Sequence, residues 1–315
     1  MDSSMTKTAS VSTVLSLVKI ARLHAVFVGF FMYLLGALLA CVAGASFSVP
    51  RFTLGYIILC FAQLSVSYSN EYYDVLTDQF SAKNFFSGGS KVLVEHPEFR
   101  RLAKWCGIGF LLLSIILTGV FVFVFSFSLL FFIFVVGGNL VGWYYTAPPL
   151  QLSYHGLGEI TTMIAIGVFI PEIGYWALNG GMDAFSLLFA VPFGLYGLAL
   201  IIDVEIPDKD ADVRANKKNL VVRKGIPTSL LIDVCALALA SLFFVTLSLI
   251  NGEFHGIDFH LVLITSLVPL GTGVFSFLRR NAPPDVLRRS VFSNVASLFL
   301  LVLFMDFYLL FLVIT

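Results

Sequence analysis

The chain has 315 residues, of which 58% are hydrophobic and only 12% are charged. A soluble domain averages about 25% charged residues, so this composition excludes a soluble globular protein and indicates an integral membrane protein. The formal net charge is zero, and no nucleic-acid partner is expected. The polar N-terminus lacks a short apolar core followed by a small-residue cleavage site, so no cleavable signal peptide is expected.

Nine apolar segments are long enough to cross a membrane, since a transmembrane helix needs about 20 apolar residues. The third and fourth segments are separated only by the sequence SFS at residues 126–128. Apolar residues surround most segments, so periodicity does not show which face meets lipid. The predicted spans are residues about 24–45, 52–72, 106–125, 128–147, 158–178, 184–203, 229–250, 260–278 and 291–314.

The lysines and arginines fall almost entirely on one side of these spans. If the N-terminus is cytoplasmic, every basic residue except Arg51 lies on the cytoplasmic side. Basic residues favour that side, and a wrong number of spans would scramble the asymmetry. We therefore expect a multi-pass protein of the cell membrane, with its N-terminus in the cytoplasm and its C-terminus outside.

Two acidic strings follow the second and sixth spans, both on the predicted cytoplasmic side. The first, NEYYDVLTDQ, places Asn70, Asp74 and Asp78 at positions i, i+4 and i+8. The second, DVEIPDKDAD, repeats the i, i+4 spacing with Asp208 and Asp212. Residues four apart share one face of a helix, so each string predicts a polar stripe at the membrane boundary.

These carboxylates have two interpretations, solvated helix ends or a metal site. Negative charge at a helix C-terminus opposes the helix dipole, and two clustered strings on one face require a compensating cation. Oxygen ligands without nearby histidine or cysteine favour Mg²⁺, which commonly joins a few carboxylates to substrate phosphate oxygens. The paired arrangement therefore favours the metal site.

The loops after both strings are basic. SAKNFFSGGSK carries Lys83 and Lys91 around a Gly-Gly turn, and VRANKKNLVVRKG carries Lys217 among five basic residues. The preference of basic residues for the cytoplasmic side explains some of them, Arg223 and Lys224 in particular. Lysines beside a carboxylate cluster, with backbone amides exposed by glycine, suit a phosphate ligand. The two regions together predict a site for divalent metal over a diphosphate.

Four stretches resemble a known family. NEYYDVLTD resembles the NxxxDxxxD motif of the UbiA superfamily of intramembrane prenyltransferases, and DKDADVRANKKNL resembles its second aspartate motif. FFSGGSKVLVEH and WYYTAPPLQLSYHGLGE resemble the 1,4-dihydroxy-2-naphthoate prenyltransferases of the menaquinone pathway. The resemblance covers essentially the whole chain.

The resemblance implies an all-α bundle of nine transmembrane helices around a central cavity. It implies a single domain, residues 1–315, with motif-bearing cytoplasmic loops at about 73–105 and 204–228. Mg²⁺, expected as two ions, would bridge the motifs to a polyprenyl diphosphate, and an aromatic acceptor would attack the allylic carbocation. The prenyl tail and product would move laterally into membrane lipid, because releasing a long chain into water costs about 0.8 kcal/mol per CH₂.

Residue roles follow by position. The catalytic residues would be Asp74, Asp78, Asp208, Asp212, Lys91 and Tyr145; the metal ligands Asn70, Asp74, Asp78, Asp208 and Asp212; and the substrate-binding residues Arg22, Asn70, Lys83, Ser90, Lys217 and Glu159. For Tyr145 the alternative is an ordinary aromatic residue at the membrane interface.

Other acidic residues lie in or beside the spans. Intramembrane carboxylates usually face the bundle interior, so Glu159 is a candidate for orienting or deprotonating the acceptor, and Glu172 a weaker one. Asp203 is the first residue of the second string, ahead of Glu205, and is interpreted as supporting the metal ligands that follow it. Asp233 and Asp306 have no surrounding motif and are interpreted as structural.

The sequence departs from the family pattern at three positions. Glu71 replaces a frequent aspartate, Glu205 replaces an asparagine common in the naphthoate branch, and Asn216 replaces a frequent glycine. Asparagine also tolerates a left-handed turn. None of these changes removes a predicted metal carboxylate, but they leave the acceptor open among the branches that prenylate hydroxybenzoate, homogentisate, haem, chlorophyllide or glycerol phosphate lipids.

Three alternatives to an aromatic prenyltransferase remain. The nearest is an enzyme that prenylates a glycerol phosphate lipid precursor. A cation- or proton-coupled transporter predicts charges and broken helices near the bilayer midplane, whereas the acids here cluster at one rim. A non-catalytic membrane scaffold has no need of two matching metal motifs.

Overall fold

The computed structural model describes residues 15–81, 89–250 and 253–315. Within these ranges the chain is helical apart from one small hairpin. Its elements are α2 (Leu23–Val42), α3 (Val49–Tyr73), α4 (Val75–Phe80), α5 (Val92–Glu95), η1 (Pro97–Phe99), α6 (Arg100–Phe125), α7 (Leu129–Trp143), η2 (Leu152–Tyr154), α8 (Gly158–Ile164), η3 (Ala165–Phe169), α9 (Ile170–Asn179), α10 (Ala184–Glu205), η4 (Ile206–Asp208), α11 (Lys209–Arg214), α12 (Leu220–Lys224), α13 (Ile226–Ile250), β1 (Glu253–Phe254), β2 (Ile257–Asp258), α14 (Phe259–Leu278) and α15 (Pro284–Ile314).

The helices confirm the predicted class, an α-helical membrane protein. Eight helical stretches of the described chain are long and apolar enough to cross a membrane, and α7 is a shorter apolar helix of 15 residues. Large apolar side chains point outward, for example Phe123 (87% exposed) and Leu249 (79% exposed). Such surfaces are typical of contact with lipid. The count of nine spans and the direction of insertion stay predictions.

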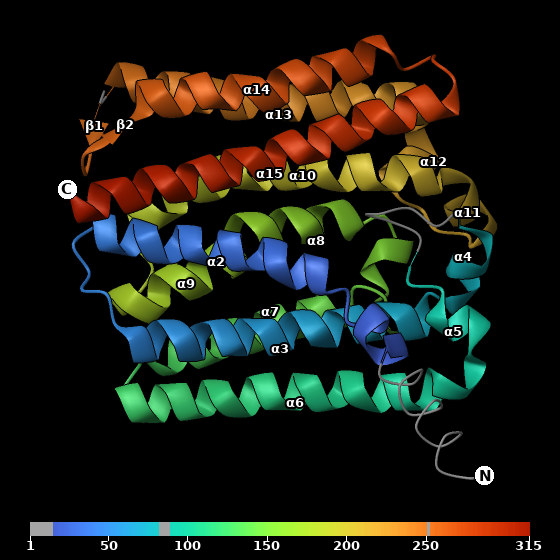
Figure 1. Cartoon of the computed structure of the whole chain (residues 1–315), viewed down its shortest axis with the longest axis horizontal. Coiled ribbons are helices and arrows are strands. Elements are labelled where there is room, and N and C mark those ends of the chain that lie inside the picture. The colour runs from blue at the N-terminus through green and yellow to red at the C-terminus, as the bar shows by residue number, and fades with distance from the viewer. Residues whose placement is uncertain (1–14, 82–88, 251–252) are drawn as a thin grey trace, which may run out of the picture.

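The long helices lie side by side along one direction (Figure 1). The short helices α4, α5, α11 and α12 gather at one end of this bundle, and the C-terminus and the β1–β2 hairpin lie at the opposite end. Helices α4 and α11 contact each other although they follow different long helices. The segments that carry the two acidic strings are therefore brought together at one end.

Glycine allows α2 and α9 to approach closely in the core. A Cβ atom added at Gly36 would lie 1.8 Å from the backbone oxygen of Pro171, and one added at Gly174 would lie 2.1 Å from that of Tyr33. Apolar side chains give little specificity within a lipid bilayer, so helices there associate through small residues that let backbones meet. This contact places α9 against the first long helix.

The boundary between the third and fourth predicted spans is confirmed. Helix α6 ends at Phe125, and Ser126 adopts a left-handed conformation with φ of 54°. Helix α7 begins after Ser128, whose hydroxyl oxygen accepts a hydrogen bond from Leu130 N at 3.2 Å. A serine N-cap satisfies one of the free amides at a helix start, so three residues suffice for the turn.

Candidate active site

The first acidic string keeps its helical spacing across a break. Helix α3 ends at Tyr73 and α4 begins at Val75, with Asp74 between them. The amide of Asp74 donates to the oxygen of Asn70 at 2.8 Å, and the amide of Asp78 donates to the oxygen of Asp74 at 2.8 Å. The three side chains therefore share one face, as predicted. Asp78 is only 6% exposed.

The second acidic string lies where α10 gives way to shorter helical turns. Pro207 sits in η4, Asp208 ends that turn, and Asp212 lies in α11. The chain then reverses at Asn216, which has φ of 57°, the left-handed conformation anticipated for this position. The amide of Lys217 donates to the oxygen of Asp212 at 2.9 Å, which fixes the lysine beside the aspartate.

Lys217 joins the two strings. Its ammonium nitrogen lies 3.2 Å from Asp74 Oδ2 and 3.6 Å from Asp212 Oδ1. Burial favours the neutral amine, but attraction from the two carboxylates outweighs it and raises the pKa of Lys217. The lysine is therefore a fixed positive charge between one aspartate of each string.

Tyr154 is a site residue that the sequence did not reveal. Its hydroxyl donates to Asp74 Oδ1 at 2.6 Å and lies 3.2 Å from Thr77 Oγ1. The ammonium of Lys217 lies 5.0 Å from the centre of its ring, within the range of a cation–π interaction. Burial and the neighbouring Asp74 raise the pKa of the Tyr154 hydroxyl, so it remains a donor. Tyr154 belongs to the quoted stretch WYYTAPPLQLSYHGLGE, but nothing in its spacing distinguished it.

Asn219 is a second such residue. Its Nδ2 donates to Asp212 Oδ2 at 2.7 Å, and its Oδ1 accepts from Val222 N at 2.9 Å, which caps α12. Glu159, the candidate for orienting or deprotonating the prenyl acceptor, also faces this segment, because its Oε1 accepts a hydrogen bond from Leu220 N. In this structure Glu159 binds the beginning of α12.

Asn70, the first residue of the first string, lies beside the segment that carries Tyr145. Asn70 Oδ1 accepts from Thr146 Oγ1 at 2.9 Å, so its amide is held by the residue next to Tyr145. A Cβ atom added at Gly158 would lie 3.3 Å from the Tyr145 hydroxyl. The hydroxyl of Tyr145 therefore lies close to the segment that carries Glu159.

Glu71 anchors both Arg22 and the chain at Ser90. Its Oε1 accepts from Arg22 Nε at 3.0 Å and from Ser90 N at 2.6 Å, and its Oε2 accepts from Ser90 Oγ at 2.7 Å. Glu71 is 1% exposed. Glu71, which departs from the family pattern, is therefore buried and binds two predicted substrate-binding residues, Arg22 and Ser90.

Lys91 follows Ser90 and folds back onto the first string. Its ammonium donates to the backbone oxygens of Asp78 and Ser81, at the end of α4. Gly89 has φ of 64°, and a Cβ atom there would lie 2.2 Å from Asp78 Oδ2, so a larger residue would have to displace the Asp78 carboxylate. The sequence showed no partner for Lys91, and the structure supplies backbone carbonyls. Lys83 lies outside the described residues.

The carboxylate oxygens of the two motifs are suitable ligands for Mg²⁺. Burial, with Glu71 and Asp74 nearby, raises the pKa of the Asp78 carboxyl to about 7. Oε2 of Glu205, which is 8% exposed, is buried without a hydrogen-bond partner among the described residues. Within those residues no three histidine, cysteine, aspartate or glutamate side chains converge on one point. Mg²⁺ usually takes one or two carboxylates together with water and substrate phosphates, so pairs such as Asp74 and Asp78 suit it.

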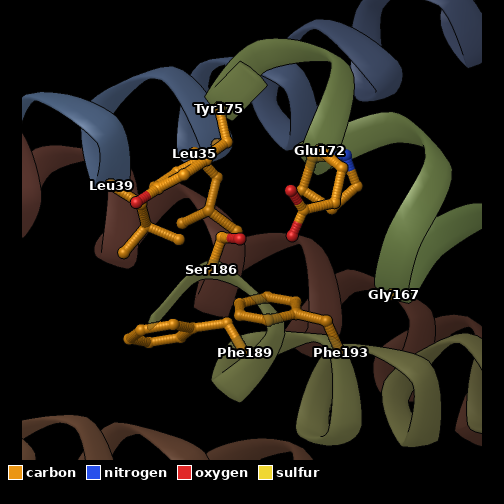
Figure 2. A pocket seen from close by; sticks show the side chains of 10 residues that line it. Leu35, Leu39, Gly167, Glu172, Tyr175, Ser186, Phe189 and Phe193 are labelled. Atoms are coloured by element: carbon orange, nitrogen blue, oxygen red, sulfur yellow. The ribbon is translucent and has the colours of Figure 1, made fainter. Parts of the chain in front are cut away.

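Glu172 lies apart from this cluster. It belongs to α9, a helix that lies toward the end of the bundle opposite α4 and α11 (Figure 1). Its carboxyl faces a cavity of about 10 Å³ lined by Ser186, Phe189 and Phe193 of α10 and by Leu35 of α2 (Figure 2). A space of this size holds about one water molecule. The acceptor role considered for Glu172 has no support from its position.

The fold and these contacts define a class: a helical membrane protein with two aspartate motifs and a lysine between them at one end of the bundle. The sequence model of the UbiA prenyltransferase family matches residues 28–295. The chain belongs to the UbiA prenyltransferase family and is a prenyltransferase, as the sequence motifs predicted.

Individual relatives are more distant. The 1,4-dihydroxy-2-naphthoate octaprenyltransferase of Bacillus subtilis (strain 168) is 25% identical over 233 residues, 73% of this chain and 72% of that protein. A UbiA homologue from Archaeoglobus fulgidus, bound to GPP and Mg²⁺, superposes with a TM-score of 0.62 at 16% identity and covers 94% of this chain and 100% of its own. A digeranylgeranylglyceryl phosphate synthase superposes with a TM-score of 0.61 at 13% identity, covering 92% and 99%. At these identities the two structures show the fold alone.

Proposed function

We propose that this protein transfers a polyprenyl group from a prenyl diphosphate to an aromatic, naphthoate-like acceptor within the membrane and releases pyrophosphate. The reaction would require Mg²⁺ and take place at the cytoplasmic end of the bundle, in a single domain spanning the chain. The observation that carries the proposal is Lys217, whose ammonium lies within 4 Å of an aspartate from each motif. Such an arrangement of two acidic motifs around one cation suits a diphosphate with its metal ions.

The metal would be held by the aspartates of both motifs. Asp74, Asp78, Asp208 and Asp212, with the amide oxygen of Asn70, are the candidate ligands, and two Mg²⁺ ions are expected. Bound there, Mg²⁺ would neutralise the negative charge of the departing diphosphate.

The protein's own groups supply the remaining charge and orientation. Lys217 carries a fixed positive charge and would donate hydrogen bonds to diphosphate oxygens. Tyr154 holds Asp74 by a 2.6 Å hydrogen bond, and Asn219 holds Asp212 by one of 2.7 Å. Tyr154 binds one oxygen of Asp74, and Asn219 binds one oxygen of Asp212. The other oxygen of each carboxylate faces Lys217. The aspartates are therefore preorganised, which lowers the cost of stabilising developing charge.

The proposed transfer breaks one bond of the prenyl diphosphate and forms one bond to the acceptor. The C1–O bond of the prenyl diphosphate breaks, and its electron pair leaves with the pyrophosphate. The allylic carbon then bonds to an electron-rich ring carbon of the acceptor. That ring carbon regains its aromaticity by giving a proton to the released pyrophosphate or, where it carries a carboxylate, by releasing carbon dioxide. The face of Tyr145 is suited to stabilise the allylic cation. Apolar helices around the site exclude bulk water, which would otherwise capture the cation.

The acceptor assignment rests on the naphthoate prenyltransferase from Bacillus subtilis and on the SGGSK and GLGE stretches. The fold shared with a digeranylgeranylglyceryl phosphate synthase supports the second candidate, a glycerol phosphate acceptor. The two differ at the reacting atom, which is a ring carbon in one case and a hydroxyl oxygen in the other.

The purified protein in lipid nanodiscs should be given geranylgeranyl diphosphate, Mg²⁺ and a panel of acceptors, with products identified by mass. We expect a prenylated aromatic product, pyrophosphate release and loss of both on chelation of the metal. A product formed only with geranylgeranylglyceryl phosphate would replace the aromatic assignment. No product with any acceptor would contradict the proposed activity.

A further inference from the structure

A buried polar cluster lies among the last four long helices, outside the site described above. At its centre is Asn294 of α15, which is 0% exposed. Its Nδ2 donates to Asp203 Oδ2 of α10 at 2.6 Å and lies 3.3 Å from Asp233 Oδ2 of α13. Its Oδ1 accepts from Thr272 Oγ1 of α14 at 2.8 Å. One side chain thus connects four helices.

The cluster is enclosed by apolar packing. Asp203 and Asp233 are both 0% exposed. On neighbouring turns the same helices contribute Ile202, Leu230, Leu237 and Val291 to the core. Apolar contacts between helices in a bilayer are nearly interchangeable, because lipid is as apolar as the side chains. Directed hydrogen bonds therefore determine how far each helix is rotated and shifted against its neighbours.

Asp203 lies close to the second motif in the chain, so the hydrogen bond that fixes its helix also affects the position of that motif. It lies in the last two turns of α10, five residues before Asp208, and η4 and α11 continue directly from that helix. Helix α11 contacts α4, which carries Asp78. Moving the end of α10 would therefore move Asp208 and Asp212 relative to the first motif.

We propose that Asp203 and Asn294 are positioning residues, which set the separation of the two aspartate motifs by fixing the end of α10. The inference rests on the proposed function for its catalytic consequence. Its structural part stands separately, because the separation of the motifs is measurable without turnover.

The chain offers a matched control. Asp306 is a buried acid on α15, 4% exposed, three turns beyond Asn294. Neither of its carboxyl oxygens has a hydrogen-bond partner among the described residues. Changing Asp306 alters a buried carboxyl in the same helix without touching the cluster.

The test uses spin labels in nanodiscs, in a background whose four cysteines are replaced. Labels at Leu76 of α4 and Val213 of α11, 69% and 53% exposed, report the distance between the motif segments. A second pair at Leu187 of α10 and Phe307 of α15, 45% and 71% exposed, reports helix packing away from the cluster.

Asp203→Leu and Asn294→Ala should broaden or shift the first distance and leave the second unchanged. The Mg²⁺ concentration for half-maximal activity should rise roughly tenfold, as for other residues that orient metal ligands. Asp203→Asn retains an oxygen that accepts from Asn294, so it should restore the wild-type distance and Mg²⁺ requirement. Thr272→Val is nearly isosteric and should shift the first distance by a smaller amount. This variant keeps the proposal testable if the larger changes prevent folding.

The proposal is overturned if Asp203→Leu leaves the first distance unchanged, or if Asp306→Asn shifts it equally. It is also overturned if Asp203→Asn is as harmful as Asp203→Leu, because the carboxylate charge would then matter rather than its position. If the wild-type protein prenylates no acceptor, the proposed function fails, and the distances still decide whether this cluster positions the motif.

Discussion

The ammonium of Lys217 lies 3.2 Å from Asp74 Oδ2, although 143 residues separate the two in the chain. The contact crosses from the second motif to the first, and Asp212 lies 3.6 Å from the same nitrogen. Lys217 therefore links the two motifs directly, and this link determines what several substitutions should do.

Lys217→Met should lower the turnover number by roughly 10²–10³-fold, the usual effect of removing one preorganised donor. It also leaves Asp74 and Asp212 without their shared cation. Lys217→Arg should retain part of the activity, because the charge remains while the donor geometry differs. Steady-state pyrophosphate release measures both. Lys218→Met, an exposed neighbour, is the control and should behave as wild type; equal losses at Lys217 and Lys218 would contradict the central role of Lys217.

Asp74→Ala and Asp208→Ala should each abolish turnover, because each removes a candidate metal ligand from one motif. The protein should remain folded and extractable, because both residues lie at the end of the bundle and are partly exposed. Activity should be followed against Mg²⁺ concentration, with helical content as a check of folding. Asp210→Ala, exposed in the same segment, should have little effect. Near-normal activity of either variant at saturating Mg²⁺ would contradict a site built from both motifs.

Glu71→Ala should destabilise the protein and loosen the chain at Ser90. It leaves the Arg22 guanidinium and both Ser90 donors without their acceptor, at about 1–3 kcal/mol for each buried group. Glu71→Gln keeps one acceptor oxygen and should fall between wild type and Ala. Thermal unfolding and amide hydrogen exchange at Ser90 provide the measurements. Glu98→Ala is the control, because the Glu98 side chain is 62% exposed. Unchanged hydrogen exchange at Ser90 in Glu71→Ala would show that Glu71 does not hold this segment.

Lys91→Ala should weaken prenyl diphosphate binding and slow pyrophosphate release, while acceptor binding changes little. Lys91→Arg should keep part of the activity. The structure adds a second expectation, because Lys91 also binds the backbone oxygens of Asp78 and Ser81. The end of α4 should therefore exchange its amide hydrogens faster in Lys91→Ala. Wild-type kinetics and wild-type exchange together would reduce Lys91 to a cytoplasmic charge without a specific contact.

The predicted orientation is testable by cysteine labelling in intact cells or oriented vesicles. Cysteines introduced next to Lys91, Lys217 and Arg288 should react only from the cytoplasmic side, and one next to Asp258 only from outside. In the structure α5, α11 and α12 lie at one end of the bundle and β2 at the other (Figure 1). Labelling of the Lys91 and Lys217 regions from opposite sides would contradict a shared site.

Much of the site's local geometry was readable from short stretches of sequence. The i, i+4 spacing of Asn70, Asp74 and Asp78 persists through the break after α3, because backbone hydrogen bonds continue across it. The left-handed turn at Asn216 and the SFS boundary were likewise local properties. Each depends only on neighbouring residues, so the sequence alone determined them, together with the membrane class and the family.

The partners of these residues were decided by tertiary structure. Tyr154 on Asp74, Asn219 on Asp212 and Asn294 between Asp203 and Asp233 follow from which helices pack together and how each is rotated. Apolar residues surround these helices on every side, so no periodicity in the sequence reveals a buried face. Rotation is set instead by close glycine contacts and directed hydrogen bonds between residues far apart in the chain, which exist only once the bundle has formed.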